Sequence, residues 1–339
     1  MYNELAKDVG IKQKIIHTGQ HYSPNMSDIF FKELEIPLPD VNFNIQHNSP
    51  HIFIGQAAES LYNYFLTEQN AAVFTYGDTN TTLAAAMAAK RCSLPLIHFE
   101  AGVRTYDKSM PEETNRIHTD RLADVNYCCT EQNFNCMQSE GYGLSIKSEV
   151  VLTGDLMLDA FLNIPPTTNR ITDHKKYIVC TIHREANLAD KQKLSNIISA
   201  LNKIHETTPV VVPLHPHTKK RLDEYTLTAN FNLLQPLGYA HMKALLSGAE
   251  YIITDSGGTS REAYFLKKKS LVVMDQPFWP EIINANCSIQ TSTDTDAIIN
   301  NFNLLPALHS DFTTNLFGTG NAAENIRKHL TVYLAQKIN

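Results

Sequence analysis

Short runs of apolar and β-branched residues alternate along the chain with longer segments in which apolar residues recur every three or four positions. The first pattern is typical of buried strands and the second of amphipathic helices. The predicted strands are residues 12–17, 72–76, 94–99, 125–130 and 149–152 in the first half, and 177–181, 210–214, 232–234, 251–254 and 270–274 in the second. Strands that alternate with helices predict parallel sheets built from βαβ units.

The pattern divides the chain into two halves, each with enough strands for a doubly wound domain. Residues 163–176 lie between them and contain Pro165 and Pro166 followed by polar residues, which is typical of a linker. We expect an α/β protein with two Rossmann-like domains, residues 1–165 and 166–321, and a final helix at 322–337 that can pack back on the first. Two such domains facing each other across a cleft place the carboxyl ends of both sheets there, where ligands bind.

Composition narrows the classes of protein that this chain can be. Its 339 residues are 43% hydrophobic and 19% charged, as in ordinary globular domains. The net charge is −6 and the Lys and Arg residues are scattered, which argues against a nucleic-acid partner. The six cysteines form no C-x-x-C pair, so we expect reduced core residues. No apolar run is long enough to span a bilayer and no signal peptide is evident, so we expect a cytoplasmic protein without a membrane partner.

The first candidate for chemistry is Asp78, in the segment Gly77-Asp78-Thr79 between a predicted strand and an alanine-rich helix. This position is the carboxyl end of the strand, where a carboxylate can act on a ligand. An equally good interpretation is that Asp78 or a neighbouring Thr caps the helix by accepting hydrogen bonds from its first N–H groups. The segment by itself leaves both interpretations open.

Two further carboxylates follow. Glu100 ends the next strand, where it loses solvation unless it has a partner, so it is a candidate acid or base; the alternative is an internal salt bridge to Arg104. Glu112 lies four residues before Arg116 in a predicted helix, so a simple surface pair would explain both. Glu112 could also complete a capping box with Ser109.

In the second half, a buried-type strand runs directly into His183. A group that titrates near neutrality at this position could serve as an acid or base, or bind phosphate. His215 ends the following strand in the same way, but the prolines on both sides favour a rigid loop and make it a lesser candidate.

The segment Thr254-Asp255-Ser256-Gly257-Gly258 closes a strand and opens a helix. The two glycines let backbone N–H groups approach an anion at the positive end of the helix, and Ser256 adds a hydroxyl. Glu262, one turn later, could accept hydrogen bonds from a ribose diol, or could merely complement the helix dipole. Neither G-x-G-x-x-G nor a P-loop motif occurs, which argues against a standard dinucleotide site.

Together these segments resemble the non-hydrolysing UDP-N-acetylglucosamine 2-epimerases along nearly the whole chain. The matching motifs, in order, are TGQHY (18–22), GDTNTT (77–82), HFEAGVRT (98–105), MPEETNR (110–116), TGD (153–155), HREAN (183–187), PLHP (213–216), TDSGGTSREA (254–263) and FGTGNAAENI (317–326). The segments MPEETNR and HREAN are also similar to those of relatives that act on UDP-2,3-diacetamido sugar acids.

The resemblance implies the two-domain fold shared with GT-B glycosyltransferases, a UDP-sugar substrate, a homodimer, and a reaction without metal or redox cofactor. It implies that UDP is eliminated across C1–C2 to give a 2-acetamidoglucal and then added back, with the proton delivered to the opposite face. The residues implied as catalytic are Asp78, Glu100, Glu112, Arg116 and His183. Those implied as substrate-binding are Gln20, His21, His215, Ser256, Gly257, Gly258 and Glu262.

The start of the sequence differs from the family pattern, which opens with a strand and a G-T-R-P-E-like turn. Met1–Ala6 reads as a helix already under way, because no N-cap residue precedes it. We expect that the natural protein begins about 20 residues earlier, the length of a short βα unit.

Three alternative functions remain open from the sequence. A glycosyltransferase would share the fold and the UDP site but would need an acceptor. A hydrolysing epimerase would release the free sugar and UDP, but its usual carboxylate segments differ from MPEETNR. A nucleotide-sugar binder without activity would hold UDP and turn nothing over.

Overall fold

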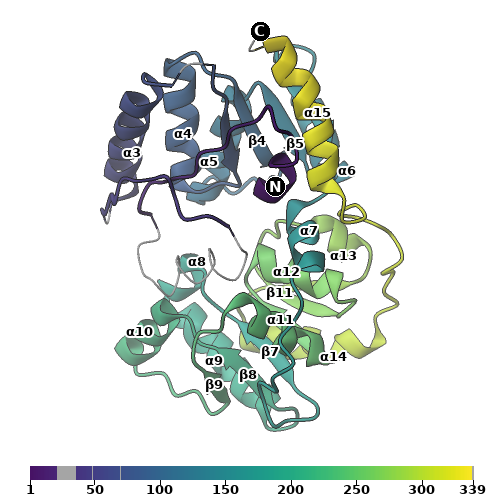
Figure 1. Cartoon of the computed structure of the whole chain (residues 1–339). Coiled ribbons are helices and arrows are strands. Elements are labelled where there is room, and N and C mark those ends of the chain that lie inside the picture. Colours follow the sequence, from purple (N-terminus) through teal and green to yellow (C-terminus); the bar gives the residue numbers. More distant parts are fainter. Residues whose placement is uncertain (21–35, 48, 69, 338–339) are drawn as a thin grey trace. The chain divides into compact units, whose positions relative to one another are not determined.

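The structure is a computed structural model that describes residues 1–20, 36–47, 49–68 and 70–337 (Figure 1). The chain divides into two compact units. Unit 1 comprises Met1–Asn163 and Leu316–Asn339, and unit 2 comprises Ile164–Asn315. Each unit contains its own parallel sheet.

Unit 1 is built on a four-stranded parallel sheet in the order β3-β4-β5-β6. These strands are β3 (Val73–Tyr76), β4 (Leu96–Ala101), β5 (Val125–Cys128) and β6 (Glu149–Leu152). A separate parallel pair joins β1 (Ile16–His17) to β2 (Val41–Asn42). The helices are α1 (Tyr2–Leu5), α3 (Pro50–Phe65), α4 (Asn80–Arg91), α5 (Pro111–Leu122), α6 (Glu131–Ser139), α7 (Leu156–Asn163) and α15 (Ala322–Lys337).

The core of unit 1 lies in separate clusters of buried apolar side chains. In one cluster, the small side chains of α4 pack with Phe53 and Leu61 of α3 and with Leu96 of the sheet. In another, α15 (yellow in Figure 1) buries Ile326 and Leu330 against aromatic residues of β4 and β5. The last helix of the chain therefore stabilises the unit to which the first residues belong.

Unit 2 has a six-stranded parallel sheet in the order β12-β11-β10-β7-β8-β9. Its strands are β7 (Ile178–Thr181), β8 (Val210–Pro213), β9 (Asn232–Leu234), β10 (Tyr251–Thr254), β11 (Ser270–Val273) and β12 (Ser288–Thr291). In chain order this is the 3-2-1-4-5-6 arrangement of a Rossmann fold. The strand order reverses between β7 and β10, and ligands of such folds bind at the carboxyl ends of these two strands.

The helices of unit 2 connect these strands. They are α8 (Glu185–Leu188), α9 (Lys191–His205), α10 (Pro216–Tyr225), α11 (Tyr239–Gly248), α12 (Gly257–Phe265), α13 (Pro280–Asn284), α14 (Thr295–Leu304) and the 3-10 helix Leu305–Ala307. In the described part of the chain, no helix is both long and apolar enough to cross a membrane.

The α/β class and the parallel sheets predicted from the sequence are confirmed. Each predicted strand overlaps a strand of the structure, although the ends differ by a few residues. The sequence missed β2 and β12. β2 has only two residues, and β12 contains Ser288, Gln290 and Thr291 instead of an apolar run, which is why neither carries a strand signal.

Candidate active site

Asp78 lies in the turn between β3 and α4. Gly77 adopts a φ of +63°, a left-handed conformation that glycine takes without strain, and this turn places Asp78 directly after the strand. The helix cap is Thr79, whose hydroxyl oxygen accepts a hydrogen bond from the Thr82 N–H at 3.3 Å. The carboxylate of Asp78 instead pairs with Arg116 of α5. The capping interpretation thus holds for the threonine and not for Asp78.

Glu100 lies in an irregular part of β4. The register with β5 shifts between Phe99 and Ala101, and Glu100 has a φ of +66°, which is unusual for a residue with a side chain. Such strain persists only where the surrounding structure enforces it, and it is common at functional sites. The alternative partner Arg104 is wrong, because Arg104 forms its ion pairs with Asp120 and Glu140.

Arg116 connects the two turns. Its Nη2 donates to Asp78 Oδ2, and its Nη1 lies 2.5 Å from the Glu100 carbonyl oxygen and 3.2 Å from Glu100 Oε1. Arg116 itself is only 2% exposed. A buried guanidinium with carboxylates on two sides is satisfied by charge-assisted hydrogen bonds, and it fixes the separation of those carboxylates. The expected surface pair of Arg116 with Glu112 is therefore replaced by this buried pairing.

The electrostatics of this group favour proton transfer. Burial raises the pKa of Asp78; Glu100 and Glu112 add to the rise, and Arg116 opposes it. Burial alone would lower the pKa of Arg116, but the Asp78 and Glu100 carboxylates raise it, so the guanidinium stays charged. A carboxyl group with a raised pKa beside a fixed cation is a candidate acid or base.

Glu112 is exposed in the first turn of α5, whereas its neighbour Glu113 is buried. Glu113 accepts hydrogen bonds from the Thr105 N–H and hydroxyl and from the Tyr106 N–H, at 2.8 to 2.9 Å. Glu113 thus anchors the loop that follows β4. The capping box suggested by Ser109 and Glu112 is not formed, since Met110 is the N-cap residue and no side chain caps the helix.

Gln20, in the TGQHY motif, contacts the start of α4. Its Oε1 accepts hydrogen bonds from the N–H and the hydroxyl of Thr81, both at 3.0 Å. Gln20 and Asn80 also line a pocket of about 130 Å³, which is large enough for part of a sugar but smaller than sites that enclose a whole ligand. His21 lies outside the described residues.

Glu100 also belongs to the one group in the described part of the chain that has the composition of a metal site. The ligand atoms of Glu100, Cys129 and Asp155 lie within 4.8 Å of one another. Arg116 already supplies positive charge at Glu100 Oε1. Acidic groups often gather without an ion, so this cluster alone does not define a metal site.

In unit 2, His183 follows β7 and Asp255 follows β10, at the point where the strand order reverses. Asp255 is completely buried and accepts hydrogen bonds from the backbone N–H groups of His183 and Arg184, both at 3.1 Å, and from Asn187 Nδ2 at 3.0 Å. The His183 ring has its Nδ1 3.5 Å from Asp255 Oδ1. A carboxylate next to one ring nitrogen orients a histidine for acid/base work through the other.

His215 and Ser256 both act as helix caps. The ring of His215 accepts a hydrogen bond from the His217 N–H at 3.2 Å, at the start of α10, and its centroid lies 6.2 Å from that of His183. The hydroxyl of Ser256 accepts from the Thr259 N–H at 3.2 Å. Gly257 and Gly258 form the first turn of α12, so the positive end of this helix lies where the sequence predicted it.

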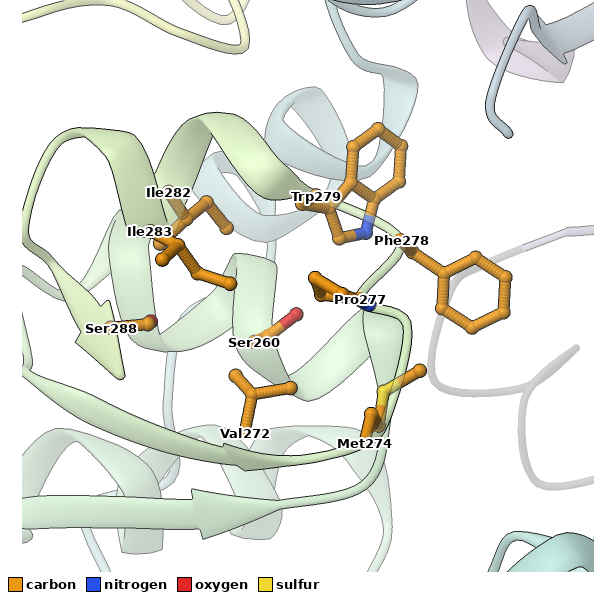
Figure 2. A pocket seen from close by; sticks show the side chains of 9 residues that line it. All are labelled: Ser260, Val272, Met274, Pro277, Phe278, Trp279, Ile282, Ile283 and Ser288. Carbon is orange, nitrogen blue, oxygen red and sulfur yellow. The ribbon is translucent and has the colours of Figure 1, made fainter. Parts of the chain in front are cut away.

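Two aromatic residues lie against Gly257. A Cβ added to Gly257 would lie 2.7 Å from Phe278 Cδ2, and Trp279 Nε1 donates to the Gly257 carbonyl at 3.0 Å. Figure 2 shows the pocket below Trp279 and the Phe278 ring pointing away from its aliphatic lining. This pocket measures about 10 Å³, barely the space of one water molecule, so it is not a sugar site.

Glu262 is 7% exposed and lies in α12. Burial raises its pKa to about 7, although Tyr239, Arg261 and Lys243 each favour the ionised form. Burial also lowers the pKa of Lys243, and Glu262 opposes that shift. Burial makes the ionised form of Glu262 unfavourable. Hydroxyl groups of a bound ligand would stabilise this form by donating hydrogen bonds to the carboxylate.

Sequence reasoning missed several polar residues that hold these turns: His98, Glu113, Asn115, Asp120 and Asp255. Asn115, for example, donates to the Asp78 carbonyl and to Asn80 Oδ1, both at 3.0 Å. All five stand inside or beside the matched motifs or on the same helix as Arg116. An ionisable or amide side chain within an apolar strand, as at His98, is the signal that could have identified such positions.

Comparisons with known proteins agree on one family. The sequence profile of UDP-N-acetylglucosamine 2-epimerase matches residues 3–331. A UDP-N-acetylglucosamine 2-epimerase homolog of Methanococcus maripaludis is 37% identical, with 92% of this chain and 90% of that protein covered. The UDP-2,3-diacetamido-2,3-dideoxy-D-glucuronate 2-epimerase of Pseudomonas aeruginosa is 33% identical, with 94% and 91% covered.

A solved structure extends the similarity to three dimensions. The Methanocaldococcus jannaschii UDP-GlcNAc 2-epimerase, crystallised with UDP-GlcNAc and UDP, superimposes with a TM-score of 0.89 at 31% identity. The alignment covers 97% of this chain and 94% of that one.

Proposed function

Because the chain belongs to the UDP-N-acetylglucosamine 2-epimerase family, we propose that it epimerises C2 of a UDP-2-acetamido sugar. The observation that carries the proposal is the buried Arg116 held between Asp78 and Glu100, all three at positions of matched motifs. This arrangement supplies ionisable groups close to a fixed positive charge.

The chemistry of the sugar explains why such groups are needed. C2 carries no carbonyl group, so its proton is not acidic enough for simple removal and return. In the proposed first step a base takes the C2 proton while the C1–O bond breaks, and UDP leaves with the bonding electrons to give a 2-acetamidoglucal. In the second step UDP adds back to C1 and a proton is delivered to the opposite face of C2. Both steps need a positioned proton carrier.

In unit 1, Asp78, Glu100 and Glu112 are the proposed proton carriers. The raised pKa of Asp78 favours it as a proton donor, and Glu100, whose Oε1 contacts Arg116, is proposed as the base. Gln20 is proposed to position the substrate through the start of α4.

In unit 2, the start of α12 is proposed to bind UDP. Ser256, Gly257 and Gly258 would present N–H groups to the diphosphate, and Glu262 would accept hydrogen bonds from the ribose. His183, oriented by Asp255, would stabilise or protonate the leaving diphosphate, with His215 beside it.

Proton NMR in deuterated water tests the reaction. The protein is incubated without acceptor, in one arm with UDP-GlcNAc and in the other with UDP-2,3-diacetamido-2,3-dideoxy-D-glucuronate. We expect loss of the C2 proton signal in at least one arm, with appearance of the C2 epimer. No exchange in either arm would contradict the proposal. Bound UDP without turnover would identify a nucleotide-sugar binder, and free sugar with UDP would identify a hydrolysing enzyme.

We also propose that the protein forms a homodimer, as the family resemblance implies, and that it lies in the cytoplasm, where its six free cysteines would stay reduced. Light scattering coupled to size-exclusion chromatography measures the mass directly, and a mass of one chain would contradict the dimer.

A further inference from the structure

His98 is a completely buried histidine in the middle of β4 to which the proposed reaction assigns no role. Its backbone lies opposite Thr75 of β3 and Asn126 of β5. Both ring nitrogens have partners: Nε2 lies 2.8 Å from the Gly77 carbonyl oxygen and Nδ1 lies 2.7 Å from Asp120 Oδ1. The ring therefore connects the turn before Asp78 to helix α5.

Both ring nitrogens of His98 face oxygen atoms of their partners. A carbonyl oxygen only accepts, so Nε2 donates to Gly77. Burial alone would raise the pKa of Asp120, but His98 and Arg104 lower it, so Asp120 is ionised and also only accepts. Arg104 Nη1 and the Gly102 N–H donate to Asp120 Oδ2 at 2.6 and 3.2 Å. The ring therefore lies between two oxygen atoms that only accept hydrogen bonds.

Arg104 completes the set of partners around Asp120. Arg104 Nε and Nη2 donate to the two oxygens of Glu140 at 2.8 and 2.9 Å. Asp120 is completely buried, and a buried carboxylate needs such partners around it. Asp120 therefore holds the His98 ring from a fixed position.

Asp120 and Arg116 lie one helical turn apart on α5, so they project from the same face of the helix. Arg116 holds the side chain of Asp78 and the carbonyl of Glu100. Asp120 holds the turn before Asp78 through His98, and directly holds the Gly102 N–H just after Glu100. Through Arg116 and Asp120, helix α5 thus holds the turn after β3 at two points and the end of β4 at two points.

We propose that His98 is a positioning residue that holds the Gly77 carbonyl, and hence Asp78, in place, while Asp120 holds the orientation of the His98 ring. His98 does not touch the reacting groups and acts through the backbone of the turn. This proposal depends on the proposed function only in the experiment that measures turnover.

Two amide variants separate the two contacts of the ring. The amide nitrogen of Gln lies at about the same distance from the backbone as Nε2, and that of Asn at about the same distance as Nδ1. His98→Gln therefore keeps the contact to Gly77, and His98→Asn keeps the contact to Asp120. Because both replacements are neutral amides in one buried position, each controls for the loss of the ring in the other.

We expect His98→Asn to lower kcat by about 10- to 100-fold, the scale of a misplacement of about 1 Å, with KM changed by less than about threefold. His98→Gln should keep kcat within about fivefold of the natural protein. Thermal melting is measured for both variants. Equal kcat values for the two variants, or losses that follow only the melting temperatures, would overturn the positioning role.

An NMR measurement that needs no substrate tests the contact to Gly77. In protein labelled with ¹⁵N-histidine, the signals of His98 are assigned by their absence in His98→Gln. We expect a slowly exchanging proton on Nε2, because this nitrogen donates to the buried Gly77 carbonyl oxygen. An Nε2 without a proton would refute this contact. Because no turnover is measured, this result stands even if the proposed reaction is wrong.

Discussion

Replacing Glu262 with Gln is expected to stabilise unit 2 while weakening UDP binding. Glu262 is buried, and burial raises its pKa to about 7 from an ordinary value of 4.5. The folded chain therefore binds a proton more tightly than the unfolded chain does. Between these two pH values the folded state holds more protons, so stability falls as the pH rises from about 4.5 to about 7. Gln has nearly the same shape and no charge, so it escapes this cost.

The size of the effect follows from the shift. One pKa unit corresponds to about 1.4 kcal/mol, so the difference between the two values destabilises the ionised form by roughly 3 kcal/mol above pH 7. Glu262→Gln should thus raise the free energy of unfolding by up to roughly 3 kcal/mol at pH 8. At pH 5 most of the gain should be lost, because Glu262 is then protonated in the folded state.

The assay can use the only tryptophan of the chain. Trp279 is buried in the same unit as Glu262, so its fluorescence during urea unfolding reports on that unit. Glu206→Gln is the matched control. Glu206 is exposed and pairs with Lys203 at 2.9 Å, and such a pair contributes at most about 1 kcal/mol. A stability gain that is equal at pH 5 and pH 8, or absent at pH 8, would refute the reasoning.

The same variant tests the binding role of Glu262. The ionised carboxylate accepts strong hydrogen bonds from a ribose diol, and hydrogen bonds to charged groups contribute about 1.5–3 kcal/mol. Calorimetry at pH 8 should show UDP bound roughly 10- to 100-fold more weakly by Glu262→Gln. In the natural protein the affinity for UDP should decrease as the pH drops below about 7, because Glu262 becomes protonated there. Unchanged affinity in Glu262→Gln would show that Glu262 does not contribute to UDP binding.

Three further predictions concern the remaining site residues. Glu100→Gln and His183→Asn should each lower turnover by about 10²- to 10⁴-fold with little change in unfolding, and near-natural rates in both would reject their roles. Gly257→Ala should weaken UDP binding in calorimetry, because the new Cβ forces the Phe278 ring to shift; equal affinity would show that the ring yields freely. Arg116→Met should cost about 1–3 kcal/mol at pH 8 in urea unfolding, because two carboxylates lose their cation. Arg116 lowers the pKa of Asp78, so the loss of Arg116 raises that pKa further. The loss of stability should therefore be smaller at pH 5 than at pH 8, and an equal loss at both would contradict this account.

The sequence by itself determined the parallel α/β framework and the places of the main strands. Apolar runs such as Ile178–Thr181 are buried on both faces, and this leaves a direct record in the residue types. The sequence also placed Asp78, His183 and the first turn of α12 after strand ends, and Glu100 at the end of a strand. These assignments needed only local patterns, because a strand end is defined by its own residues.

The tertiary structure decided which of these groups are partners. Local spacing pointed to Glu112 as the partner of Arg116, because it is four residues away in a helix. The true partners are 38 and 16 residues away, at the ends of neighbouring strands. Sequence patterns also could not distinguish Glu112 from Glu113, since adjacent helical residues point in directions about 100° apart and only the packing of α5 shows which one is buried.

The same limit applies to the residues that support the site. His98 and Asp120 are 22 positions apart in the sequence, and their contact exists only because α5 packs against β4. Asp255 holds the loop after β7 from a position 71 and 72 residues further along the chain. Residue types record burial and turns, which are local, whereas a hydrogen bond between distant segments depends on the sheet order that brings the segments together.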